Sequence, residues 1–155
     1  MGLEKYSCEP RVIPYAQELV FAKLSSLKNL KEFVSPEKIE ELNKQGVKID
    51  NFKLEDFEAS DDYCSFKINM LGKVGIEVVE REPHKTIKFQ GEKSMPFPVI
   101  FWIQLVQVEA ESCKIRLTLH AELNPMIRIM VGKHLEKGIE KMADMLAAID
   151  YRENP

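Results

Sequence analysis

Three histidines are the residues of this chain best suited to proton transfer near neutral pH, because an unperturbed imidazole titrates there. His84 falls in a predicted turn, and His120 falls on the polar side of a predicted strand. His134 falls in a predicted helix, near Met130 and Leu135. It fits three interpretations: a polar contact inside a cavity, an acid/base group if a partner lies beside it, or an ordinary helix histidine. The sequence alone leaves all three open.

Nucleophilic, metal-assisted and phosphate-binding chemistry have no recognisable pattern in the sequence. The serines and cysteines lie in no nucleophile-elbow motif, and no glycine-rich phosphate loop occurs. Glu136 and Glu140 fall on the charged face of a predicted helix, so they form no inward pair of carboxylates. No set of metal ligands can be recognised. We therefore predict no catalytic residue, no metal site and no cofactor, and no reaction can be named.

The three cysteines, Cys8, Cys64 and Cys113, each fall inside a predicted strand. Their odd number and the absence of a Cys-x-x-Cys spacing argue against a disulfide framework or a zinc site. We expect buried, reduced thiols, as in a reducing compartment.

Composition and charge exclude several classes of protein. The 155 residues are 45% hydrophobic and 30% charged, which predicts one globular domain over residues 1–155. The net charge is −3 and the acids and bases are interspersed, so we expect no nucleic-acid partner, which would need a concentrated basic face. The longest apolar candidate, Pro98 to Val108, contains Gln104 and Gln107, so we expect no membrane span. The first ten residues lack a secretion signal, which predicts a cytoplasmic protein.

The N-terminal part of the chain is predicted to be a strand followed by short helices. Alternation over Lys5 to Val12 predicts the strand, and helical spacing then predicts a helix over Pro14 to Leu24. A second short helix is expected over Leu27 to Phe33. A third starts at Ser35, where a capping hydroxyl precedes a proline and an acid, and ends at Gly46.

The middle of the chain, up to about Leu123, alternates between apolar and polar residues as strands do. Short turn sequences separate the strands, so neighbouring strands must pair antiparallel. The clearest strand runs from Lys114 to Leu123, and the turn Glu111–Ser112 joins it to a long strand over Pro98 to Ala110.

The C-terminal part is predicted to be one long helix from Met126 to about Asp150, started by the capping pair Asn124–Pro125. The residues expected to face inward are Ile127, Val131, Leu135, Gly138, Met142, Leu146 and Ile149. The opposite face carries Lys133, Glu136, Lys137, Glu140, Lys141 and Asp144, and we interpret it as solvated rather than as a docking surface.

This order of elements resembles the START-like, or helix-grip, superfamily (SRPBCC), which includes polyketide cyclases and birch-pollen-allergen-type proteins. The segments that carry the resemblance are Val20 to Leu30 and Lys114 to Glu122, the second leading directly into the terminal helix. The resemblance implies an α+β fold in which a curved antiparallel sheet wraps around a long C-terminal helix. It also implies an apolar cavity between sheet and helix, for lipids, polyketides or similar molecules.

We therefore expect binding or transport of a hydrophobic small molecule. The alternatives are an enzyme of the polyketide cyclase or aromatase type and a partner-binding module with a filled core, and the oligomeric state is not set by the sequence. Methionine and aromatic side chains shape adaptable apolar pockets, although the same residues also fit an ordinary core. The candidate ligand-binding residues are Met95, Phe97, Trp102, Met126, Met130 and His134.

Overall fold

The computed structural model describes residues 2–29, 44, 54–68, 72–93, 95, 97–149 and 151. The predicted helix at residues 35–46, apart from Lys44, lies outside the described residues, as does the end of the predicted helix at 27–33.

The described strands form a single antiparallel sheet of eight strands. They are β1 (Gly2–Ser7), β2 (Arg11–Ile13), β3 (Leu54–Ala59), β4 (Tyr63–Ile68), β5 (Gly72–Glu82), β6 (Thr86–Gly91), β7 (Val99–Glu109) and β8 (Ser112–Leu123). The order across the sheet is β1-β8-β7-β6-β5-β4-β3, and β2 also pairs with β8. The predicted antiparallel pairing of neighbours is confirmed.

The first strand differs from the prediction, which placed one strand over Lys5 to Val12. The structure instead has two strands, separated by Cys8 to Pro10. Pro10 has no N–H to donate and cannot continue a strand in the sheet, so the chain leaves β1 and pairs again with β8 from Arg11.

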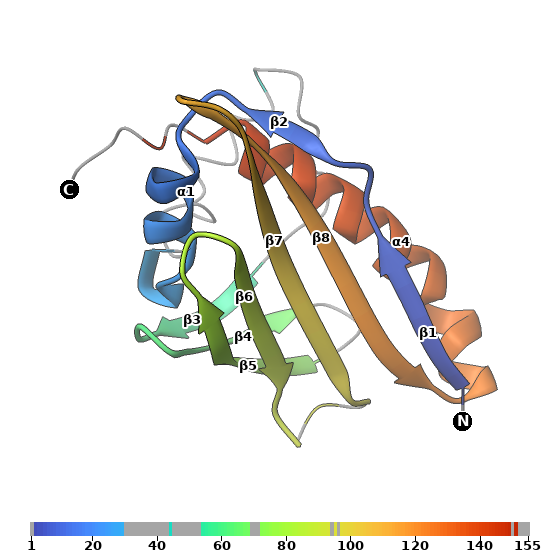
Figure 1. The fold of residues 1–155 in the computed structure, drawn as a ribbon. Helices are drawn as coiled ribbons and strands as arrows, with labels where there is room; N and C mark the ends of the chain where they lie inside the picture. Colours follow the sequence, from blue (N-terminus) through green and yellow to red (C-terminus); the bar gives the residue numbers. More distant parts are fainter. Residues whose placement is uncertain are drawn as a thin grey trace.

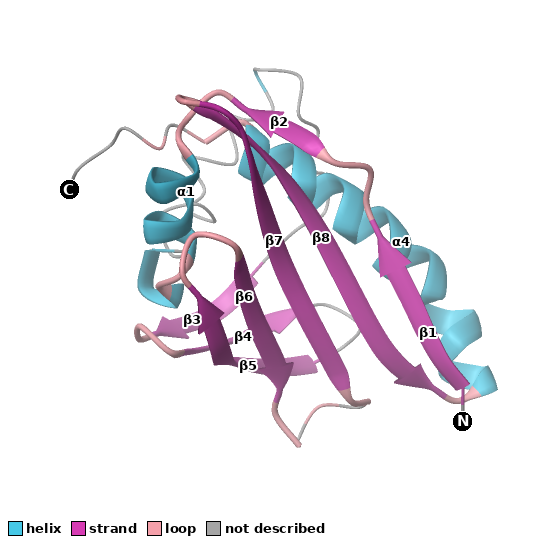
Figure 2. Ribbon diagram, viewed as in Figure 1, coloured by secondary structure: helices cyan, strands magenta, loops and turns pink. Residues whose placement is uncertain are grey.

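The sheet is strongly curved, and β7 and β8 run in a different direction from β3, β4 and β5 (Figure 2). Three register shifts contribute to this bending. They lie in β3 between Glu55 and Glu58, in β5 between Val78 and Glu80, and in β7 between Gln107 and Glu109. An extra residue in one strand of an antiparallel pair bends that strand and increases its twist. The curvature gives the sheet a concave face, which we call the inner face.

Three helices accompany the described part of the sheet: α1 (Gln17–Leu24), the 3₁₀ helix η1 (Leu27–Asn29) and α4 (Pro125–Ala147). Helix α1 packs against β7 and η1 against β4, whereas α4 packs chiefly against β8, β1 and β2 (Figure 1). A curved antiparallel sheet with a long C-terminal helix on its inner face is the predicted α+β helix-grip arrangement. The terminal helix ends at Ala147, three residues before the predicted end.

The start of α4 has the predicted chemistry. The Asn124 side chain accepts a hydrogen bond of 2.8 Å from the Ile127 backbone N–H, and Pro125 occupies the first turn. This bond satisfies one of the N–H groups that the first helical turn leaves without a partner.

Replacing Asn124 by alanine should therefore lower the free energy of unfolding by about 1 kcal/mol. Urea denaturation of the two proteins measures the difference. Asn124→Ser keeps an acceptor oxygen at the cap and should remain close to the parent. An equal loss in the serine and alanine variants would contradict the capping role.

The apolar interior has two clusters, one toward each end of the inner face. The larger contains Ile115 and Leu117 of β8, together with residues of α1 and of the C-terminal half of α4. The smaller contains Phe97, Val99, Ala121, Leu123 and Val131, and joins β7 and β8 to the N-terminal half of α4. Leu119 packs against both clusters, so it lies where they meet.

The inward stripe of α4 agrees with the prediction in part. Val131 and Leu146 are buried and Leu135 is half-buried, as predicted. Gly138 and Met142 are exposed, although both were expected inside. Ile139, Ala143 and Met145 are the buried helix residues that the prediction did not include.

Candidate ligand-binding face

A row of five apolar side chains crosses the inner face and packs with the larger cluster, of which Phe89 is a member. The register places Tyr6 opposite Leu119, Leu119 opposite Phe101, Phe101 opposite Phe89, and Phe89 opposite Val78. Directly opposed residues of antiparallel strands point to the same face of a sheet. The rings of Phe89 and Phe101 lie 5.7 Å apart, within the range of favourable aromatic pairs. We call these five side chains the aromatic row.

The aromatic row is less covered than the layer of residues beside it. Leu117, Ile103 and Ile87 form the neighbouring layer and are buried. In the aromatic row Phe89 is buried, whereas the other four side chains are only half-buried. Inward-facing apolar side chains that keep solvent exposure form a surface on which an apolar molecule can be desolvated.

The face of α4 that continues from Val131 and Leu135 is also incompletely covered. Gly138 lies seven residues after Val131, so it shares that face of the helix. A Cβ atom at Gly138 would have no neighbour within 4 Å, and Met142, one turn further on, is 36% exposed. The helix surface at Gly138 and Met142 therefore meets open space, whereas the neighbouring Leu135 and Ile139 pack against the sheet.

Polar contacts fasten α4 to the β1 and β2 edge of the sheet. Arg128 bonds Glu4 at 2.8 Å, and Arg11 bonds Glu140 at 2.8 Å and Asp144 at 2.9 Å. Hydrogen bonds to these two carboxylates raise the pKa of Arg11, so its positive charge is retained. The helix is therefore held along the side that faces β1 and β2.

Tyr6, the member of the aromatic row that lies in β1, fills the space between this edge of the sheet and α4. A Cβ atom at Gly132 would lie 3.6 Å from the Tyr6 hydroxyl oxygen, so the phenol reaches the helix where it has no side chain. Partial burial raises the pKa of Tyr6, and the nearby Glu4 carboxylate raises it further. Tyr6 therefore stays protonated at neutral pH and offers a polar hydroxyl beside the apolar row.

Trp102 occupies a different face from the one the sequence suggested. Successive strand residues point to opposite faces, and its neighbours Phe101 and Ile103 point inward. The Trp102 ring lies 4.6 Å from His120, and the Lys88 ammonium lies 5.7 Å from the ring. Trp102 thus belongs to the outer face, which corrects its expected position in the cavity wall. Burial lowers the pKa of His120, and the positive charge of Lys5 adds to the effect.

The other five candidate residues fall into two groups. Met95 and Phe97 pack with the smaller cluster, on the inner face. Met126, Met130 and His134 have exposed side chains on α4, so the structure does not bring them together with Met95 and Phe97. Their expected places in the wall of an internal cavity are therefore corrected.

The residues that sequence reasoning missed are those of the aromatic row, above all Phe101. The sequence pattern could have identified Phe101, because every second residue of a strand points to the same face. Phe101 therefore shares the face of Ile103 and Leu105, which are buried. Tyr6 could not be assigned to the aromatic row in the same way, because its neighbour across the sheet depends on pairing between the two ends of the chain.

Two further properties concern the described residues. Nowhere among them do three or more His, Cys, Asp or Glu side chains gather in a way that could hold a metal ion. None of the helices they form is long and apolar enough to cross a membrane.

Comparison with solved structures places this geometry in a known fold. Norcoclaurine synthase from Thalictrum flavum superimposes with a TM-score of 0.65 at 12% identity, over 94% of this chain and 85% of that one. The same enzyme in complex with dopamine and hydroxybenzaldehyde gives a TM-score of 0.62 at 12% identity, with the same coverage. A Thermus thermophilus protein, TTHA0849, gives 0.61 at 19% identity over 93% and 94% of the two chains.

The Aha1 dimer from Colwellia psychrerythraea is a more distant match, with a TM-score of 0.56 at 18% identity over 94% and 97% of the chains. No protein-family model and no curated protein sequence matches the chain. At these identities the likeness concerns the fold alone, which is the helix-grip fold of the START-like and birch-pollen-allergen-type proteins.

Proposed function

We propose that the chain binds an apolar, ring-containing small molecule between the inner face of the sheet and α4. The observation that carries this proposal is the incomplete cover of the aromatic row, on a face where the adjacent layer is buried. The open space at Gly138 supports it from the helix side.

The chemistry of the face suits such a ligand. Phe101 and Phe89 offer ring faces and edges, and aromatic pairs in offset or edge-to-face geometry gain about 0.5–1.5 kcal/mol beyond the burial of area. The Tyr6 hydroxyl can bind one polar atom of the ligand and so fix its orientation. The complex of norcoclaurine synthase with dopamine and hydroxybenzaldehyde is consistent with ring-containing ligands in this fold.

Filling the face should test the proposal. Leu119→Trp places a large side chain in the middle of the aromatic row, and Lys114→Trp adds the same side chain to the outer face of the same strand. We expect the parent and Lys114→Trp to take up members of a panel of fluorescent fatty acids, sterols and aromatic polyketides. Leu119→Trp should bind the same probes at least about tenfold more weakly, because its indole occupies the ligand's place.

Thermal unfolding of the same variants separates an open face from a filled core. Where open space absorbs the indole, Leu119→Trp should melt close to the parent. In a filled core the added volume should cost about 1–3 kcal/mol. Absence of uptake by the parent, together with that loss in Leu119→Trp, would overturn the proposal and favour the partner-binding module. Conversion of a poly-β-ketone by the parent would instead favour an enzyme of the polyketide cyclase type.

A further inference from the structure

The outer surface of α4 begins with three apolar side chains that no other described part of the chain covers. Met126 is 73% exposed, Ile129 85% and Met130 57%. Spacings of three and four residues place them next to one another on the helix surface. We call them the apolar ridge. Single exposed apolar residues are ordinary, but three adjacent ones on one helical turn form a contiguous patch.

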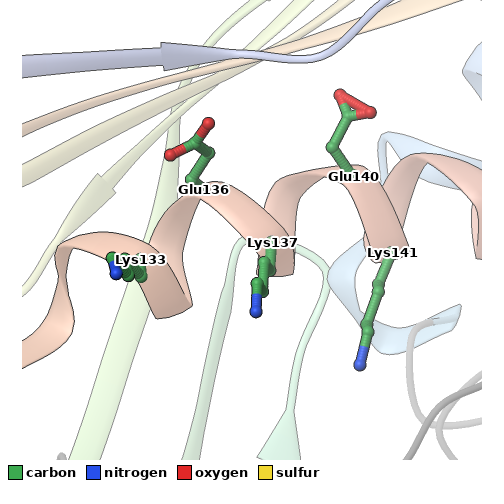
Figure 3. Close-up of a pocket in the computed structure, with 5 residues that line it drawn as sticks. All are labelled: Lys133, Glu136, Lys137, Glu140 and Lys141. Carbon is green, nitrogen blue, oxygen red and sulfur yellow. The ribbon is translucent and has the colours of Figure 1, made fainter.

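A basic stripe continues the apolar ridge along the helix. Lys133, Lys137 and Lys141 follow at intervals of four residues, and all three are exposed. Among the described residues, no carboxylate lies within ion-pair distance of them. Figure 3 shows Lys137 and Lys141 pointing to one side of α4, while Glu136 and Glu140 point to the other. These five residues line a shallow depression on the helix surface.

The acids of this helix are directed toward the sheet edge instead of toward the lysines. Arg11 binds both Glu140 and Asp144. Glu136 and Glu140 also line the groove between α4 and β1, together with Tyr6. Arg11 offsets one of the two negative charges that it binds, and the three lysines have no carboxylate partner among the described residues. The side of α4 that carries the lysines therefore has a positive local charge, on a chain whose net charge is −3.

We propose that the apolar ridge and the basic stripe dock the protein on an anionic lipid membrane surface. A helix with apolar residues beside lysines can lie in the plane of the interface, with its apolar side chains in the acyl boundary and its ammonium groups near lipid phosphates. Met126, Ile129 and Met130 supply the first contact, and Lys133, Lys137 and Lys141 the second. This docking does not depend on ligand binding at the inner face.

The shape of the surface favours a membrane over a protein partner. The three apolar side chains form a ridge on a helix, and none of them lines the depression beside the lysines, where a folded partner would place an anchoring side chain. A bilayer deforms around such a ridge. A second copy of the chain would bring lysines toward lysines, because Glu140 and Asp144 already bind Arg11. The lysines of the basic stripe are complementary to phosphatidylserine headgroups, to which each contributes about 1 kcal/mol near the surface.

Sedimentation with vesicles tests the docking. We expect the full chain to bind vesicles of phosphatidylcholine mixed with phosphatidylserine, to bind phosphatidylcholine alone much more weakly, and to be released by salt. Lys137→Gln should lower the partition coefficient about fivefold, which corresponds to about 1 kcal/mol. Ile129→Ser should lower it about tenfold, because the most exposed side chain of the ridge no longer enters the acyl boundary.

Two matched variants distinguish this surface from general effects of charge and hydrophobicity. Lys114→Gln removes one exposed positive charge from the outer face of β8, and Val106→Ser removes an apolar side chain that is 62% exposed on β7. Both should bind vesicles as the parent does. Equal losses in these controls, or no binding to mixed vesicles at low salt, would overturn the proposal. Self-association of the parent that Ile129→Ser abolishes in sedimentation velocity would assign the ridge to a second copy instead.

Discussion

Replacing Ile115 by alanine should lower the free energy of unfolding by about 2–5 kcal/mol. Ile115 lies in β8 with 0% of its surface exposed, opposite Arg11 of β2 and Leu105 of β7. Both neighbouring strands hold the backbone of β8 in place, so the surroundings cannot collapse into the space that the lost methyl groups leave. The loss of apolar burial and the cost of the cavity that remains therefore both lower the free energy of unfolding.

Ile129→Ala provides a matched control for this change, because the same atoms are removed from a side chain that is 85% exposed. Its free energy of unfolding should stay within about 0.5 kcal/mol of the parent, since no buried contact is lost. Urea denaturation of the three proteins gives both differences. Similar losses in the two variants would mean that the apolar ridge of α4 is covered by another part of the chain.

The sequence was informative where local chemistry decides structure. Alternation from Lys114 to Leu123 predicted β8, because a strand with one buried face needs apolar residues at every second position. Asn124 and Pro125 marked the start of α4. The N–H groups of a first helical turn have no partner within the helix, so a capping oxygen can accept from one of them and a proline, which has no N–H, is tolerated there. The antiparallel order followed from short connections.

The candidate site was harder to predict, because it depends on which faces meet in three dimensions. Methionine and tryptophan were favoured as pocket residues by type, whereas strand phase places Phe101 inward and Trp102 outward. Helix spacing identified Val131 and Leu135 as inward residues. It could not show that Arg11 and Glu4 form ion pairs with α4 and hold it against the β1 and β2 edge of the sheet. Such long-range pairs have no local sequence signature.

The contacts of α4 also suggest how the two proposals fit together in one molecule. The ion pairs of Arg128 and Arg11 fasten the helix along the β1 and β2 edge. The inward stripe and the outer ridge lie on different sides of this fastened helix. A bound ligand and a membrane surface could therefore contact α4 at the same time, since Leu135 and Gly138 serve one face and Ile129 the other.

The two cysteines of the inner sheet face should react with a thiol reagent far more slowly in the native protein than in denaturant. Burial raises the pKa of Cys64 to about 12 and that of Cys113 to about 11, from an ordinary value of 9.0. Only the thiolate is the nucleophile, so at about pH 8 the native reaction should be roughly a thousandfold slower for Cys64 and a hundredfold slower for Cys113. Ellman's reagent measures both rates. Rapid, complete native labelling of these residues would contradict their buried positions.

The same raised pKa values predict how the stability depends on pH. Above about pH 9 the unfolded thiols lose protons that the native thiols keep, so the native state binds more protons and the free energy of unfolding falls as the pH rises. The stability that the two buried thiols contribute is fully present below about pH 9 and is lost progressively toward the native pKa values near 11 and 12.

Urea denaturation at about pH 8 and pH 10 should show this loss in the parent. A variant with Cys64→Ala and Cys113→Ala should lose less stability over the same interval, because it lacks the two thiols whose pKa values burial raises. Equal losses in parent and variant would show that the two thiols ionise as readily in the native protein as in the unfolded chain.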